Sequence, residues 1–338
     1  NAKTYEYDAC YNVIKETDAN GNSVLKTYNI FNKPTEITDK NGKKTTFTYD
    51  SKGNITKITY PVNEGKTPVE TFEYNDRNQI VKHTDLRGMA TVYTYDSHSL
   101  PATQKTGSRN AVRYSYSNGL LMSETDAMNN TILYGYNDIG QLVSRKDSEN
   151  NVTLYEYDAI GNLIKATDAN GKSVVNEYDC NNQKIAVTDA NGNKTEYSYN
   201  GNMKNDVVTM PDGNTVQYEF DGEDRPVKIT DQAGNVTALT YDPAGRIVSK
   251  RLPDGAVLKY EYDSAGNVVK EINPLGAATV KTYDKNGNVL SVTDNEGNIT
   301  RYQYNAMSKV TRAVNAVSGA TVYSYSSAGD LLSETDAL

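Results

Sequence analysis

The sequence has 338 residues, a formal net charge of -8 at pH 7 and only 37% hydrophobic residues. Globular domains are usually about 45–50% apolar, so this composition argues against ordinary compact domains. The net charge has the wrong sign for a phosphate-binding surface, and no apolar run is long enough for a transmembrane helix. The 27 tyrosines, against 4 Phe and no Trp, argue against disorder, because disordered chains are poor in aromatic residues.

One tyrosine position recurs from the start of the chain to its end. It occurs 16 times, once as Phe, and 13 of the 15 intervals are 21 residues. The two exceptions are an interval of 25, which contains an insertion near residues 60–68, and an interval of 20. We call these residues the repeat anchors: Tyr7, Tyr28, Tyr49, Tyr74, Tyr95, Tyr116, Tyr136, Tyr157, Tyr178, Tyr199, Phe220, Tyr241, Tyr262, Tyr283, Tyr304 and Tyr325.

Each repeat contains two turn signals, which are clear in the copy that spans residues 155–172. The first runs from Asp158 to Asn162 and the second from Asp168 to Lys172. Asp can hydrogen-bond the backbone that follows it, and Gly reaches positive φ without a Cβ clash. We therefore predict that the following glycines close turns: Gly21, Gly42, Gly161, Gly171, Gly192, Gly245, Gly266 and Gly287.

The runs between the turns have the composition and period of strands. Leu163–Thr167 and Val174–Tyr178 are rich in Thr, Tyr, Val and Ile, which suit a pleated, half-buried surface. Tyr155 and Tyr157 are two residues apart, so their rings share one face. No segment shows a sustained 3.6-residue period, which predicts essentially no helix.

These features predict an all-β fold of tandem 21-residue β-hairpins that form a spiralling antiparallel sheet. A single hairpin is marginal in water, whereas tandem hairpins bury one another. Tyrosines would carry much of the buried area and stack on the tyrosines of the neighbouring hairpin. Buried hydroxyls need partners, and we expect the abundant Thr, Asn and Asp side chains to supply them.

The pattern Tyr-x-Tyr-Asp-x-x-Gly-Asn-Leu, followed by Thr-Asp-x-x-Gly-Asn, resembles the YD repeat, also called the Rhs repeat, over residues 1–338. Bacterial Rhs and wall-associated polymorphic toxins, the B and C components of insecticidal toxin complexes, and teneurins carry this repeat. The resemblance implies a shell of β-hairpins, which in the bacterial members encloses a C-terminal toxin.

Two departures from the bacterial pattern matter. Asp242-Pro243-Ala244-Gly245 has the letters of the family's cleavage motif, but it occupies an ordinary first-turn position, and we interpret it as a turn with Pro at its second residue. The chain starts and stops inside a repeat, without the polar caps that solenoids need. We therefore expect one continuous array over residues 1–338, truncated at both ends.

The repeat pattern accounts for the positions of the polar residues that could form a site. The sequence therefore predicts no catalytic, cofactor or metal site. The turns at 18–22 and 189–193 faintly resemble a calcium loop but lack its further ligands, and turn formation is the better interpretation; calcium in a few turns is a minor alternative. His83 and His98 lack a third metal ligand, and Cys10 and Cys180 are expected to be free thiols.

The leading hypothesis is a non-catalytic structural segment of a large bacterial secreted or cell-surface protein, with the C-terminal effector of its parent as partner. The alternative is an adhesin-like or fibre-forming module that binds glycans or itself. Tyr11 and Tyr60, which lie outside the anchor positions, are then the candidates for stacking on a sugar. An enzyme is the least favoured of the three.

Overall fold

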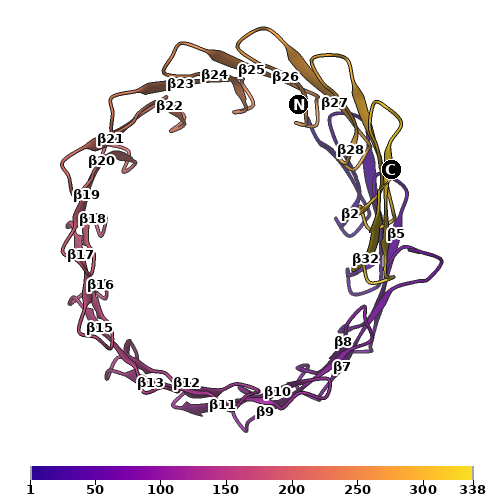
Figure 1. Cartoon of the computed structure of the whole chain (residues 1–338). Helices are drawn as coiled ribbons and strands as arrows, with labels where there is room; N and C mark the ends of the chain where they lie inside the picture. Colours follow the sequence, from indigo (N-terminus) through magenta and orange to yellow (C-terminus); the bar gives the residue numbers. More distant parts are fainter. Residues whose placement is uncertain (1, 337–338) are drawn as a thin grey trace. The chain divides into compact units, whose positions relative to one another are not determined.

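The computed structural model describes residues 2–336 as strands, turns and short connections. Figure 1 shows the strands following one another in chain order. The 32 strands are β1 (Thr4–Tyr7), β2 (Val13–Thr17), β3 (Ser23–Tyr28), β4 (Pro34–Thr38), β5 (Lys44–Tyr49), β6 (Ile55–Thr59), β7 (Val69–Tyr74), β8 (Ile80–Thr84), β9 (Ala90–Tyr95), β10 (Pro101–Thr106), β11 (Val112–Ser117), β12 (Leu120–Thr125), β13 (Thr131–Tyr136), β14 (Leu142–Lys146), β15 (Val152–Tyr157), β16 (Leu163–Thr167), β17 (Ser173–Tyr178), β18 (Lys184–Thr188), β19 (Lys194–Tyr199), β20 (Asn205–Thr209), β21 (Thr215–Phe220), β22 (Pro226–Thr230), β23 (Val236–Tyr241), β24 (Ile247–Arg251), β25 (Val257–Tyr262), β26 (Val268–Ile272), β27 (Ala278–Tyr283), β28 (Val289–Thr293), β29 (Ile299–Tyr304), β30 (Val310–Val314), β31 (Ala320–Tyr325) and β32 (Leu331–Thr335).

The predicted all-β fold is confirmed: the strands form one antiparallel sheet, and residues 2–336 contain no helix. It follows that this part of the chain has no helix with the length and apolar character that crossing a membrane requires. The anchor ends the first strand of its repeat, or in β11 stands next to the end. Each repeat is thus one hairpin, as its two turn signals predict.

A β-bulge interrupts most hairpins at the anchor. In β15 and β16, Glu156 pairs with Lys165 but the next residue, Tyr157, pairs with Leu163, so one residue of β16 is left over. The same shift recurs at the anchor of β1, β3, β5, β7, β13, β17, β19, β21, β25, β27, β29 and β31. Bulges bend a strand and increase its local twist, so the repeat contains its own device for curving the sheet.

The chain divides into two compact units. Unit 1 comprises Asn1–Thr91, Tyr241–Lys250 and Ala256–Leu338, and unit 2 comprises Val92–Thr240 and Arg251–Gly255. Unit 1 therefore contains hairpins from both ends of the sequence. In Figure 1 the indigo strands β2 and β5 lie beside the gold strands β27, β28 and β32 of the same unit.

Burial is shallow throughout. Among the aromatic residues and the aliphatic residues other than proline within 2–336, only Ala186 and Leu239 are buried, at 2% and 9% exposure. The accessible surface is 20268 Å², whereas a compact protein of 37.3 kDa would expose about 14,000 Å². Within each unit the strands pack mainly against their sequence neighbours. The apolar side chains of the sheet are therefore half-buried rather than enclosed in a core.

Candidate functional site

The anchor tyrosines join each hairpin to the one before it through their hydroxyls. Tyr178, for example, donates to the backbone carbonyl of Leu163 at 3.2 Å. The register between β16 and β17 begins only at Lys165, so the tyrosine supplies a donor to a carbonyl beyond that ladder. Our expectation of Thr, Asn and Asp partners was wrong, because the hydroxyls reach the backbone instead.

At least eleven anchors make this bond, at 2.6–3.2 Å, to a carbonyl at or next to the start of the preceding second strand. Phe220 has no hydroxyl to donate, and Tyr7 is 54% exposed. Two of the ring contacts join residues of one strand, Tyr5 to Tyr7 and Tyr218 to Phe220. The bonding anchors are Tyr28, Tyr49, Tyr74, Tyr136, Tyr157, Tyr178, Tyr199, Tyr262, Tyr283, Tyr304 and Tyr325.

The turns are built around the carboxylate of their first residue. In the turn 158–162, Asp158 Oδ1 accepts the backbone N–H groups of Ile160 and Asn162, and its Oδ2 accepts the Asn162 side-chain amide at 2.9 Å. The fourth residue donates back to the carbonyl of the first and has positive φ. The glycines that the sequence assigns to this position have φ between +77° and +98°: Gly21, Gly42, Gly161, Gly171, Gly192, Gly245, Gly266 and Gly287.

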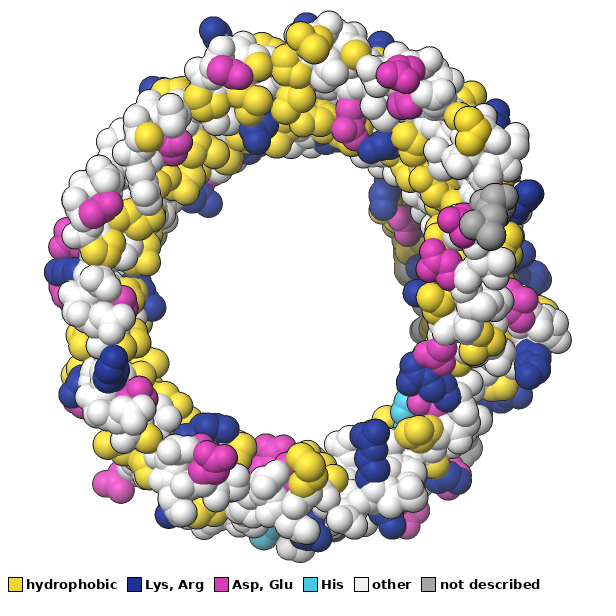
Figure 2. Space-filling model, in the orientation of Figure 1, with side chains coloured by type: hydrophobic (Ala, Val, Ile, Leu, Met, Phe, Trp, Pro, Cys, Tyr) yellow, Lys and Arg dark blue, Asp and Glu magenta, His cyan; other side chains and the backbone are white. Residues whose placement is uncertain are grey.

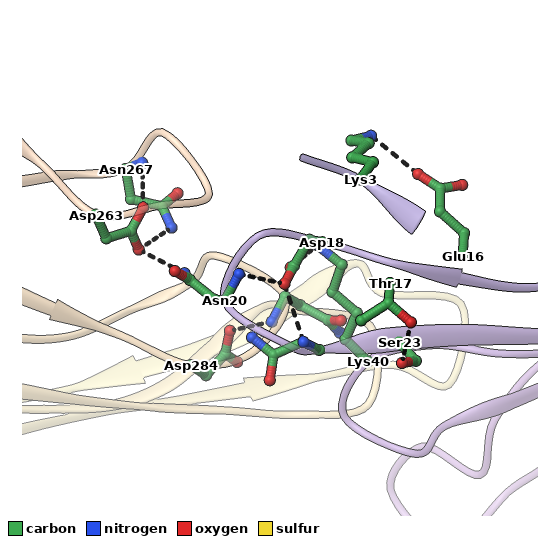
Figure 3. A network of polar contacts seen from close by, with 12 residues as sticks. Lys3, Glu16, Thr17, Asp18, Asn20, Ser23, Lys40, Asp263, Asn267 and Asp284 are labelled. Atoms are coloured by element: carbon green, nitrogen blue, oxygen red, sulfur yellow. Dashed lines mark hydrogen bonds and ion pairs between the residues drawn. The ribbon is translucent and has the colours of Figure 1, made fainter. Parts of the chain in front are cut away.

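In unit 1, second turns of the first four repeats contact first turns of the last four, and we call this contact the seam. The Asn20 side-chain amide donates to Asp263 Oδ2 at 3.0 Å, although the two residues are 243 positions apart (Figure 3). Asp263 also accepts the side-chain amide of Asn267 within its own turn. One carboxylate oxygen thus serves both its own turn and the facing one.

The next pair of turns in the seam makes this bond in both directions. Asn41 donates to Asp284 Oδ2 at 2.9 Å, and Asn286 donates back to Asp39 Oδ2 at 2.8 Å. Both turns begin with the sequence Asp-Lys-Asn-Gly. We call this reciprocal pair the Asn/Asp clasp.

The remaining seam contacts are an ion pair and the insertion. The Arg87 guanidinium donates to the Asp330 carboxylate, with Nε to Oδ2 at 2.8 Å. In the insertion, Asn63 is 2% exposed and its amide lies 3.4 Å from both the Met307 sulfur and the Ser326 carbonyl. The insertion that breaks the 21-residue period therefore reaches across the seam.

Hydrogen bonds lower the pKa of three carboxyl groups of the seam. Burial raises the pKa of Asp263, but hydrogen bonds from Asn267 and Asn20 outweigh burial and leave it below its ordinary value. The pKa of Asp284 is lowered in the same way, with burial opposed by Asn288 and Asn41. The bond from Arg87 is the main cause of the lowered pKa of Asp330.

A nearly buried ion pair joins two neighbouring turns of the seam. Lys40 Nζ lies 2.6 Å from Asp18 Oδ2, and the Asp18 side chain is only 6% exposed (Figure 3). Asp18 Oδ1 accepts the backbone N–H groups of Asn20 and Asn22. Burial raises the Asp18 pKa, yet Lys40 and these donors leave it lower than usual.

The Asp-Pro-Ala-Gly segment forms a first turn, as interpreted from the sequence. Asp242 Oδ1 accepts two backbone N–H groups, and Oδ2 accepts the Arg246 guanidinium at 2.7 Å. These bonds, led by the backbone bond of Arg246, lower the pKa of Asp242. Arg246 also lies over the Tyr262 ring, 4.6 Å from its centre. Both carboxylate oxygens of Asp242 are therefore engaged in a turn that ties two hairpins together.

The two candidate stacking tyrosines have different surroundings. Tyr11 is 88% exposed and has positive φ in the first turn. The Tyr60 hydroxyl instead donates to Glu70 Oε1 at 3.3 Å, and Glu70 also contacts His83, which stacks on Phe72. Burial and the Glu70 carboxylate raise the pKa of Tyr60. Only Tyr11 presents an open ring.

The other sequence candidates do not converge on a common site. His98 lies in an exposed turn of unit 2, while His83 belongs to unit 1. Cys10 and Cys180 are free and exposed. Residues 2–336 hold no group of three or more His, Cys, Asp or Glu side chains placed to bind a metal ion. In the turn 189–193, the Asp189 carboxylate accepts hydrogen bonds from N–H donors. These bonds show that Asp189 stabilises the turn.

Charged side chains form short pairs along the strands. A Glu one residue before the anchor pairs with a Lys on the next strand, as Glu156 does with Lys165 at 2.8 Å. In Figure 2, charged side chains of both signs are interspersed among hydrophobic ones. The same pair recurs in Lys15–Glu6, Lys82–Glu73, Lys228–Glu219 and Lys270–Glu261.

Sequence analysis missed the seam residues. Asn20, Asn41 and Arg87 occupy the third position of second turns, and no local pattern marks that position. Their partners lie 243 residues away. The irregular length of the insertion near residues 60–68 was the one local feature of the sequence that distinguished a seam turn from the other turns.

The fold is shared with solved toxin-complex structures. A mutant Tc holotoxin pore from Photorhabdus luminescens matches with a TM-score of 0.64 and 14% identity, over 98% of this chain and 22% of that chain. The TcdB2-TccC3-TEV structure gives 0.63 and 15%, over 99% and 22%. TcdB2-TccC3 without its hypervariable C-terminal region gives 0.63 and 15%, over 99% and 21%. This chain thus spans about a fifth of the chains it matches.

Sequence comparison identifies the repeat itself. No curated protein matches the sequence. The model of the RHS repeat matches residues 28–64, 136–173, 220–257, 241–278 and 283–321, which together cover just over half of the chain. The hairpins, their turns and these matches agree, and the chain belongs to the RHS repeat family.

Proposed function

We propose that this chain is a non-catalytic wall segment of a larger bacterial protein that is secreted or displayed on the cell surface. In that protein it forms one continuous array of about 16 repeats. Its role is to present one extended sheet surface to a partner polypeptide.

The observation that carries this proposal is the large accessible surface of the sheet. The chain exposes 20268 Å², about one and a half times the area expected of a compact protein of its mass. Half-buried Tyr and Val residues contribute to that surface, as in β15 and β25. Apolar surface of this kind is characteristic of an interaction face.

We further propose that the partner is a C-terminal effector of the parent protein. The similar solved structures contain TccC3, and one of them lacks a hypervariable C-terminal region. A wall that encloses such a segment needs turn-to-turn contacts to close gaps between hairpins. The seam of unit 1 is a contact of that type.

The test begins with the gene that encodes this chain. The full-length product is expressed, and limited proteolysis follows any segment beyond the array, with the isolated segment as control. We expect the segment to be digested much more slowly in the full-length protein. A gene without such a segment, or equal digestion rates, would overturn the encapsulation proposal.

Tyr11 favours one second candidate, a glycan-binding module. Its side chain is 88% exposed, and an open aromatic ring can stack on a sugar. A glycan array probed with the chain and with Tyr11→Ser tests this candidate. Binding that is lost in the variant supports it, and binding that is absent from both proteins, or unchanged by the substitution, rejects it.

A further inference from the structure

The Asn/Asp clasp shows that one kind of turn is complementary to itself. In the turn 39–43, Asp39 Oδ1 accepts the turn's own backbone N–H groups, while Oδ2 accepts Asn286 of the facing turn. Asn41, two residues later, donates outward to Asp284. An Asp-x-Asn-Gly turn thus presents one acceptor and one donor, and a second such turn satisfies both.

Unit 2 carries two further Asp-x-Asn-Gly turns on neighbouring hairpins. They begin at Asp168 and Asp189, and both carboxylates accept their own backbone N–H groups as Asp39 does. Asn170 and Asn191 are exposed. The only side-chain contact shown for either is a bond from Lys172 to Asn191 Oδ1 at 3.4 Å, which leaves the Asn191 amide hydrogens available. Asp189 Oδ2 also accepts the Asn193 side-chain amide, just as Asp284 Oδ2 accepts that of Asn288 while it bonds Asn41 in the clasp. Unit 2 therefore displays two adjacent half-clasps.

We propose that these two turns are a docking edge for a second copy of this chain. In a two-fold arrangement, Asn170 of each copy donates to the carboxylate at position 189 of the other. Asn191 likewise donates to the carboxylate at position 168. The spacing of the turns, two strands or about 9.5 Å, is the same in both copies, so all the pairs form together. The proposal does not depend on the presence of an effector.

A second copy fits this edge better than an unrelated partner because it carries the matching donor and acceptor at the matching spacing. Isologous contacts of this kind close after two subunits. The interface is small compared with stable dimers, so the association is weak and concentration-dependent. Lys172, whose Nζ contacts Asn191, brings a positive charge to this acidic edge.

Sedimentation equilibrium of the purified 338-residue chain, up to about 1 mM, tests the proposal. The weight-average mass is expected to rise toward that of a dimer. Asn170→Asp replaces a donor with a carboxylate opposite Asp189 and should weaken association at least about tenfold. The double variant Asn170→Asp/Asp189→Asn exchanges donor and acceptor and should restore it. Circular dichroism verifies that each variant is folded.

Asn181→Asp is the matched control, because Asn181 holds the same third position in the first turn 179–183 at the opposite end of its hairpin. It should associate like the unmodified chain. The proposal is overturned if the chain stays monomeric, if Asn170→Asp associates normally, or if the exchange fails to restore association. Equal loss in Asn181→Asp would also overturn it, since that result indicates head-to-tail contact.

Discussion

The side-chain amide of Asn41 donates a hydrogen bond to the carboxylate of Asp284, 243 residues further along the chain. The bond is one half of the clasp between a second turn and a first turn in unit 1. The bond shows that the turns of this chain also make contacts between hairpins that are distant in the sequence. In the clasp, each Asp organises its own backbone with one oxygen and accepts the facing turn's Asn with the other.

Changing Asn41 should therefore disturb a contact far away in sequence. Asn41→Asp places a carboxylate against Asp284, and like charges in contact are destabilising. We expect faster hydrogen exchange in both turns, 39–43 and 284–288. Asn170→Asp, in an exposed turn of the same type, should leave exchange unchanged in dilute solution. Unchanged exchange in Asn41→Asp would mean that the clasp does not hold the seam.

Acid should weaken the seam. The pKa values of Asp263 and Asp284 are lowered in the folded protein, so their stabilising contribution is complete above the unfolded value of about 3.9 and is lost as the pH falls through the folded values. Hydrogen-exchange protection of the seam turns, measured by mass spectrometry at a series of pH values, should fall below about pH 4. An Asn20→Ala/Asn41→Ala variant should show a smaller fall, and an identical pH profile would contradict the assignment.

The hydroxyl of an anchor tyrosine should contribute measurably to the coupling of two hairpins. Tyr157→Phe removes the bond to the Leu142 carbonyl, which is 2.9 Å long, and should lower the local opening free energy by about 1 kcal/mol. Tyr155→Phe is the control, because within residues 2–336 no bond from the Tyr155 hydroxyl is seen. Native-state hydrogen exchange in β14 and β15 gives the measurement. Equal effects of the two variants would assign the loss to packing instead.

Turn glycines should be required for their backbone conformation and not for space. Gly171 has φ of +77°, and a Cβ there would meet nothing within 4 Å. Gly171→Ala should cost about 1 kcal/mol in thermal or urea unfolding, because alanine rarely adopts this φ. Gly171→Asn should cost less, since Asn tolerates the left-handed region, as Asn182 does at the same turn position. A larger loss with Asn than with Ala would refute this explanation.

Shortening the insertion should open one part of the seam without unfolding its hairpin. Replacing residues 60–68 by a five-residue turn restores the 21-residue interval but removes the Asn63 contacts to Met307 and Ser326. We expect faster proteolysis in the turn 305–309, with the strands β6 and β7 still protected. Proteolysis at the original rate would show that the insertion has no role across the seam.

The hairpins could be predicted from the sequence because their causes are local. The period of Tyr155 and Tyr157, the Asp at 158 and the Gly at 161 all act within a few residues. The acceptor of the Tyr178 hydroxyl could not be predicted, because the Leu163 carbonyl is available only where the ladder of β16 and β17 begins at Lys165. The seam was also beyond local reasoning, since its paired residues lie 243 positions apart in the sequence.

The shallow burial of the sheet has a thermodynamic consequence. Compared with a compact protein of 37.3 kDa, the chain removes about a sixth less surface from water when it folds, judged from its 20268 Å² of accessible area. The heat-capacity change of unfolding and the denaturant m-value both scale with that area. Both should be lower per residue than in globular domains, so the stability curve of the array is flatter with temperature. Its hairpins can thus keep a similar margin of stability over a wider thermal range than a compact core would.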